Sequence, residues 1–222
     1  MSQPRVLFFD AAGTLIRLPR GVGWHYRDVA LRHGCEVGER ELNMAFRGVW
    51  KAMPVRVATR MARADDDRGW WRALVGEVLD LCGVAPWQLD REAYFAELYE
   101  EFTRPGVWEL YPEVSEVLDA LAGRCELGVL SNFDGRLRAI LAGHGVLDRF
   151  RHVVLSSEVG ADKPDPWIFE RALALAGVAP QEALHVGDDP RCDWEGARAA
   201  GLRTFHLQRP DNNLRAIIPL VS

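Results

Sequence analysis

Apolar and polar positions follow each other in blocks along the chain, and these blocks predict a fold that mixes strands and helices. Five short runs are almost continuously apolar, which is typical of strands that are covered on both faces of a sheet. They are residues 5–11, 126–132, 152–157, 183–188 and 203–207. Helical patterns precede or separate the last four runs, over residues 112–123, 134–145, 165–177 and 192–201. This alternation predicts an α/β core with a doubly wound, parallel, Rossmann-like sheet.

The alternation breaks between the first and second strands. Residues 17–107 contain amphipathic helical stretches, over 39–53, 67–83 and 90–102, and no convincing strand. We therefore expect two domains: an α/β core formed by residues 1–16 and 108–222, and an all-helical cap formed by residues 17–107.

Composition narrows the class of protein. The chain has 222 residues, of which 48% are hydrophobic, so it can bury a full core and an insert. The net charge of −5 and the lack of a basic block argue against nucleic acid as a partner. No apolar run approaches the ~18 residues of a membrane span, and the first run is stopped by Asp10, too early for a signal peptide. We expect a cytoplasmic protein with no membrane partner; nothing in the sequence indicates its oligomeric state.

Polar side chains gather where the predicted strands end. Ligands of doubly wound sheets bind beyond the carboxyl ends of the strands. The residues at or just after these ends are Asp10, Ser131, Asn132, Lys163, Asp188, Asp189 and Asp193. Several carboxylates at one edge repel each other unless a cation offsets them. Mg²⁺ prefers one or two carboxylates together with water and phosphate oxygens, so this edge predicts a magnesium site.

Four segments resemble the motifs of the haloacid dehalogenase superfamily, in the same order. They are FFDAAGTLI (8–16), LSNFD (130–134), DKPDPWIF (162–169) and HVGDDPRCDWEGARAAG (185–201). The helical insert after the first motif resembles the subfamily that has a helical cap. Residues 22–34 and the tail of the chain are similar to the branch that includes the rhythmically expressed proteins of animals.

The resemblance implies a role for each polar residue of the sheet edge. Asp10 would be the nucleophile and a metal ligand, with the backbone carbonyl of Ala12 and the carboxylate of Asp188 as the other protein ligands. Lys163 and Ser131 would assist catalysis by neutralising and positioning the transferred group. Thr14 and Asn132 would bind phosphate oxygens, and Asp189 and Asp193 would act behind the metal or fix Lys163. The implied protein is a Mg²⁺-dependent phosphatase of a small phosphorylated metabolite, acting through an aspartyl phosphate.

Ala12 departs from the phosphatase pattern, which has a second aspartate at this position as general acid and base. Such a group contributes ~10²–10⁴-fold in rate. Three interpretations stay open. The chain is a phosphohydrolase with specialised activity; or a 2-haloacid dehalogenase, whose halide leaves without a proton and whose chemistry needs no metal; or a catalytically weak binding module. The sequence does not identify the substrate.

Overall fold

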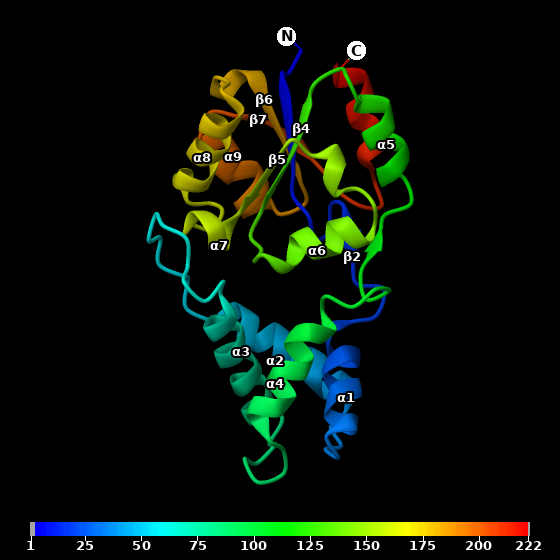
Figure 1. The fold of residues 1–222 in the computed structure, drawn as a ribbon, viewed down its shortest axis with the longest axis vertical. Coiled ribbons are helices and arrows are strands. Elements are labelled where there is room, and N and C mark those ends of the chain that lie inside the picture. The colour runs from blue at the N-terminus through cyan, green and yellow to red at the C-terminus, as the bar shows by residue number, and fades with distance from the viewer. Residues whose placement is uncertain (1–2, 222) are drawn as a thin grey trace. The chain divides into compact units, whose positions relative to one another are not determined.

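A five-stranded parallel sheet forms the centre of the α/β unit in the computed structural model, which describes residues 3–221 (Figure 1). The strands are β1 (Val6–Phe9), β4 (Glu126–Ser131), β5 (His152–Leu155), β6 (Ala183–Gly187) and β7 (Arg203–His206). Their order in the sheet is β5-β4-β1-β6-β7, with all neighbours parallel. Each strand lies within a predicted run, and the predicted fold class is confirmed. Because β1 is central, the residue that follows it has strands on both sides.

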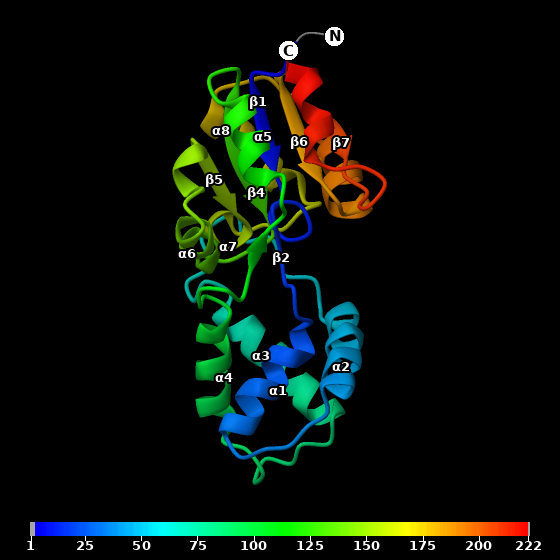
Figure 2. The same ribbon diagram turned by 90° about the vertical axis from the view of Figure 1, so that its right-hand side faces the viewer.

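Helices cover both faces of this sheet. They are α5 (Val114–Leu121), α6 (Arg136–Gly143), α7 (Ser156–Val159), α8 (Pro166–Ala176) and α9 (Gly196–Ala199), with short helical turns η1 (Leu147–Arg149), η2 (Pro180–Glu182), η3 (Pro190–Glu195) and η4 (Leu214–Val221). Figures 1 and 2 show α8 and α9 on one face of the sheet, and α5 with the C-terminal η4 on the other. On the α8 face Phe8, Leu130 and Phe169 are fully buried. This burial explains why the strands read as continuous apolar runs.

A two-stranded antiparallel ribbon, which the sequence pattern did not predict, follows the first motif. Strand β2 (Ile16–Arg17) pairs with β3 (Glu109–Leu110), and the N–H of Tyr111 donates to the carbonyl of Leu15 over 3.0 Å. Two-residue strands are too short to produce a periodic signal. The ribbon lies where the chain leaves the α/β unit, after Arg17, and where it returns to it.

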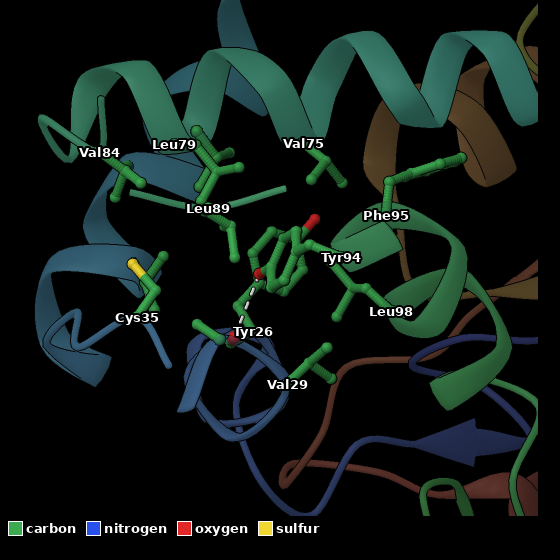
Figure 3. Packing of buried hydrophobic residues seen from close by; sticks show 14 of the residues in the cluster. Tyr26, Val29, Cys35, Val75, Leu79, Val84, Leu89, Tyr94, Phe95 and Leu98 are labelled. Carbon is green, nitrogen blue, oxygen red and sulfur yellow. Dashed lines mark hydrogen bonds between the residues drawn. The ribbon is translucent and has the colours of Figure 1, made fainter. Parts of the chain in front are cut away.

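Residues 18–55 and 67–108 form a second unit, which is a bundle of four helices. The helices are α1 (Val22–Arg32), α2 (Glu39–Ala52), α3 (Arg68–Leu81) and α4 (Arg91–Glu101). Side chains from several of these helices meet in one apolar core, in which Tyr94 donates a hydrogen bond to the carbonyl of Tyr26 over 3.1 Å (Figure 3). This bond satisfies the buried hydroxyl. Among the described residues no helix combines the length and the apolar character needed to cross a bilayer.

The segment Arg56–Asp66 packs with the α/β unit, although our predicted boundaries placed it in the helical insert. The N–H of Thr59 donates to the carbonyl of Gly160 over 2.8 Å. Arg56 and Arg63 both donate to the carboxylate of Asp162, over 2.9 and 3.0 Å. These contacts depend on polar groups that lie far apart in the sequence, so hydrophobic periodicity could not indicate them.

Candidate active site

Asp10 follows the central strand and lies at the carboxyl edge of the sheet. Its N–H continues the ladder by donating to Val186, and its side chain is nearly buried, with the residue 8% exposed. Oδ1 accepts hydrogen bonds from the hydroxyl of Ser131 (3.0 Å) and from Nζ of Lys163 (2.7 Å). Burial raises the pKa of Asp10, and the ammonium of Lys163 offsets only part of this effect. The carboxylate is thus poorly solvated, which favours its use as a nucleophile.

Lys163 joins two acids of the site. Its Nζ donates to Asp10, to Oδ1 of Asp193 (2.5 Å) and to the carbonyl of Leu130 (2.9 Å), which uses all three of its protons. Burial alone would lower the pKa of this lysine, but the two carboxylates outweigh it and hold the pKa above its ordinary value. Lys163 is therefore a permanent positive charge, 3% exposed, fixed beside Asp10.

Asp193 is held by His185, which was not among the predicted site residues. His185, on β6, places Nε2 2.8 Å from Oδ1 of Asp193, and the N–H of Asp189 donates to the other oxygen. Burial would raise the pKa of Asp193, yet Lys163 and His185 hold it well below its usual range. A side chain at Gly187 would lie 2.2 Å from Asp193, so only glycine admits this arrangement. The signal in the sequence was a histidine inside an otherwise apolar strand.

Asp188 follows β6 and faces the turn after β1. Its Oδ1 accepts a hydrogen bond from the hydroxyl of Thr14 over 3.2 Å, and a Cβ at Gly13 would lie 2.4 Å from its carboxylate. Gly13 also has φ of +88°, a conformation that favours glycine. Partial desolvation of the carboxyl, together with the charges of Asp10 and Asp193, raises the pKa of Asp188 to about 6. Among residues 3–221, no basic side chain forms an ion pair with Asp188.

Two of the predicted site residues have their polar groups engaged elsewhere. The side-chain amide of Asn132 donates to the carbonyl of Lys163 (2.9 Å) and accepts from its N–H (2.6 Å). Asn132 therefore fixes the backbone of Lys163. The carboxylate of Asp189 accepts hydrogen bonds from the N–H groups of Arg191 and Cys192, which makes Asp189 the N-cap of η3. The predicted roles of Asn132 in phosphate binding and of Asp189 behind the metal stay predictions.

The donor set fits a divalent cation. Oxygens of Asp10, Asp188 and Asp193 lie within 4.8 Å of one another. Three carboxylates and the one ammonium of Lys163 leave two negative charges. Asp193 is committed to three hydrogen-bond donors, so Asp10 and Asp188 are the carboxylates that can hold the ion. The carbonyl oxygen of Ala12 accepts no hydrogen bond from residues 3–221, and it can complete a set of oxygen ligands of the kind Mg²⁺ prefers.

Comparisons with known proteins identify the family of the chain. Residues 4–201 match the model of the haloacid dehalogenase-like hydrolase family. The chain is 36% identical to human haloacid dehalogenase-like hydrolase domain-containing protein 3, over 99% of the chain and 86% of that protein. It is 29% identical to the Rhythmically expressed gene 2 protein of Drosophila melanogaster, over 90% of the chain and 82% of that protein. A phosphoserine phosphatase of Thermus thermophilus is 40% identical over 60% of the chain and 52% of its own length.

Solved structures share the fold at low identity. The HAD-hydrolase YfnB of Bacillus subtilis, bound to magnesium, has a TM-score of 0.77 and 16% identity, with 99% of both chains covered. The defluorinating L-2-haloacid dehalogenase Rha0230 has the same TM-score and 23% identity, with 93% of this chain and 82% of that one covered. From the family match, the relatives and the four motifs, this chain belongs to the haloacid dehalogenase-like hydrolases, in the branch of the rhythmically expressed proteins.

Proposed function

We propose that this hydrolase is a Mg²⁺-dependent phosphatase of a small phosphorylated metabolite, with Asp10 as its nucleophile. The observation that carries the proposal is the charge pattern of the site. One ammonium is shared by Asp10 and Asp193, while Asp188 is left uncompensated. A site with this excess of negative charge can bind a divalent cation, and the bound cation can in turn bind an anionic ester.

The chain supplies the parts for two successive transfers. The carboxylate of Asp10 attacks phosphorus, the bond to the leaving oxygen breaks, and an aspartyl phosphate forms. Water then attacks this intermediate, so that phosphate is released and Asp10 is regenerated. Lys163 keeps Asp10 ionised and offsets the charge of the phosphoryl group, and Ser131 orients the carboxylate. Mg²⁺, when bound, supplies further neutralisation of the phosphoryl oxygens; Asp10, Asp188 and the carbonyl of Ala12 are the residues that would hold it.

The residue at position 12 affects which phosphate esters the protein is expected to hydrolyse. Ala12 has no proton to give to a leaving alkoxide, so we expect a preference for esters whose leaving group is already a weak base, such as acyl or aryl phosphates. The name of the Thermus thermophilus relative, a phosphoserine phosphatase, supports phosphoryl chemistry for this chain. It also makes phosphoserine a substrate to be tested.

Haloacid dehalogenation is the second candidate, and Ala12 is the observation that favours it. Halide departs without a proton, so the missing acid is no handicap to that reaction. It does not account for Asp188, whose pKa is raised by partial desolvation and then by the charges of two neighbouring carboxylates. A bound cation would account for the position of this carboxylate.

A substrate panel distinguishes the two candidates. The purified protein is assayed with p-nitrophenyl phosphate, acetyl phosphate, phosphoserine and 2-chloropropionate, each with Mg²⁺ and with EDTA. We expect phosphate release that requires Mg²⁺, and no activity in Asp10→Asn, which keeps the shape of the side chain but cannot form the intermediate. Chloride release that resists EDTA would favour the dehalogenase. Undiminished phosphatase activity in Asp10→Asn would remove Asp10 as the nucleophile, and no turnover of any substrate would contradict both candidates.

A further inference from the structure

Arg209 contacts the turn after the nucleophile from a distant part of the chain. It lies in the loop that follows β7 (orange-red in Figure 2), outside the four motifs and beyond residues 4–201 of the family match. Its Nη2 donates to the carbonyl of Thr14 over 3.1 Å, and its Nε to the carbonyl of Gly13 over 3.4 Å. Arg209, which lies 195 positions after Thr14, thus satisfies two backbone acceptors of this turn.

The guanidinium of Arg209 is itself held in place. Nη2 lies 2.6 Å from Oε1 of Glu113, a residue that is only 3% exposed. The guanidinium lies over the ring of Tyr111, 3.6 Å from its centroid. Burial would raise the pKa of Glu113, but Arg209 and backbone N–H groups together hold it below its usual value. All of these residues belong to the α/β unit, so Arg209 connects a buried anion and an aromatic ring to the turn.

The turn carries two groups of the proposed metal site. The N–H groups of Thr14, Leu15 and Ile16 converge on the carbonyl of Ala11, which closes the turn from the inside. Arg209 donates hydrogen bonds to the carbonyls of Gly13 and Thr14. Within the same turn lie the carbonyl of Ala12 and the hydroxyl of Thr14, which donates to Asp188.

We propose that Arg209 is a positioning residue for the magnesium site: it fixes the Gly13–Thr14 turn so that the carbonyl of Ala12 and the carboxylate of Asp188 converge with Asp10. The inference rests on the proposed function, since it concerns the same metal. An arginine suits the task because its planar fork can donate to the carbonyls and to Glu113 at once while stacking on Tyr111. A lysine ammonium keeps the charge but cannot make this set of contacts.

The test measures metal binding without substrate. Apparent Mg²⁺ affinity is obtained from the rise of the unfolding temperature with Mg²⁺ concentration, for the wild type, Arg209→Lys and the double variant Arg209→Gln/Glu113→Gln. The double variant avoids a buried carboxylate without a partner. The control is Arg215→Lys, which removes an arginine fork from Glu116 on the surface of the same unit. We expect both Arg209 variants to bind Mg²⁺ about tenfold more weakly or worse, as is usual for residues that orient metal ligands, and Arg215→Lys to bind it like the wild type.

The outcomes separate this inference from the proposed function. A purely structural role for Arg209 would lower the unfolding temperature without Mg²⁺ but leave the Mg²⁺ affinity unchanged. Wild-type affinity in both Arg209 variants therefore overturns the positioning role and leaves the proposed function intact. If neither variant folds, as judged by circular dichroism, Arg209 is a stabilising residue and the inference is also overturned. A wild type that binds no Mg²⁺ overturns the proposed function, and the role of Arg209 with it.

Discussion

Nζ of Lys163 lies 2.7 Å from Oδ1 of Asp10, although 153 residues separate the two in the sequence. Both residues are almost inaccessible to solvent, so each would be costly to bury alone. The same ammonium also serves Asp193. The ammonium and the two carboxylates offset each other's charge. Removing the ammonium would leave two buried carboxylates without a partner, which costs free energy of folding.

Replacing Lys163 by methionine should therefore be severe. Methionine fills a similar volume but leaves Asp10 and Asp193 without their cation. Breaking a buried ion pair in this way costs about 3–5 kcal/mol. We expect a loss of this size in the free energy of unfolding, measured by urea denaturation in EDTA at pH 7.5, together with loss of hydrolase activity.

The chain provides a matched control for this substitution, since Lys51 is its only other lysine and is exposed. Lys51→Met should change the free energy of unfolding by no more than about 0.5 kcal/mol. Equal stability of the two variants would mean that the cation of Lys163 is not needed by its two acids.

Asp188→Asn should make the metal-free protein more stable in a way that depends on pH. The folded state raises the pKa of Asp188 to about 6 from an ordinary 3.8, so it disfavours the ionised form. The contribution of this group to stability falls as the pH rises from about 4 to about 6 and stays low above that range. Asparagine escapes this penalty. In EDTA, the unfolding temperature of Asp188→Asn should exceed that of the wild type by more at pH 7.5 than at pH 4.5.

Asp189→Asn is the control, because it removes a charge from the neighbouring position while asparagine still caps η3. Mg²⁺ should stabilise Asp189→Asn as it does the wild type, and should not stabilise Asp188→Asn. A pH-independent effect in Asp188→Asn would argue against repulsion among the acids.

Much of this site could be predicted from the sequence because parallel strands bring their carboxyl ends to one edge. Ser131 ends β4, while Asp10, Lys163 and Asp188 come after β1, β5 and β6, and the structure places the four residues together as that rule requires. The apolar strand runs and three of the four helices of the insert, α2, α3 and α4, were identified from patterns that are local and repeat with a fixed period.

The remaining features depend on contacts between distant polar groups. Arg209 meets the first motif only through backbone carbonyls, which have no signature in the sequence. The two hydrogen bonds between the side-chain amide of Asn132 and the backbone of Lys163 likewise have no signature in the sequence. His185 gains its role from Asp193, which lies on the next helical turn. Such pairings are set by packing, and periodicity does not report them.

Gly13→Ala should separate backbone strain from damage to the site. Alanine at φ of +88° costs about 1–2 kcal/mol, and its Cβ would also lie 2.4 Å from the carboxylate of Asp188. Gly177→Ala is the matched control: φ is +63°, and no atom lies within 4 Å of the added carbon. Urea denaturation should show a loss of stability in both variants. Only Gly13→Ala should lose activity, by about 10²-fold, because it displaces Asp188. A fully active Gly13→Ala would contradict the proposed role of Asp188.

Ala12→Asp should restore the general acid that phosphatases of this superfamily carry. The position is exposed, so an aspartate can be added there without disturbing the core. General acid catalysis contributes about 10²–10⁴-fold where the leaving group needs a proton. We therefore expect kcat for alkyl phosphates to rise by about 10²-fold, and kcat for p-nitrophenyl phosphate to rise much less, since p-nitrophenolate leaves without a proton. Ala12→Asn has nearly the same shape and cannot transfer the proton, so it should stay at the wild-type rate with both esters. If the aspartate and asparagine variants behave alike, or if the gain is equal for both esters, proton transfer is not what position 12 lacks.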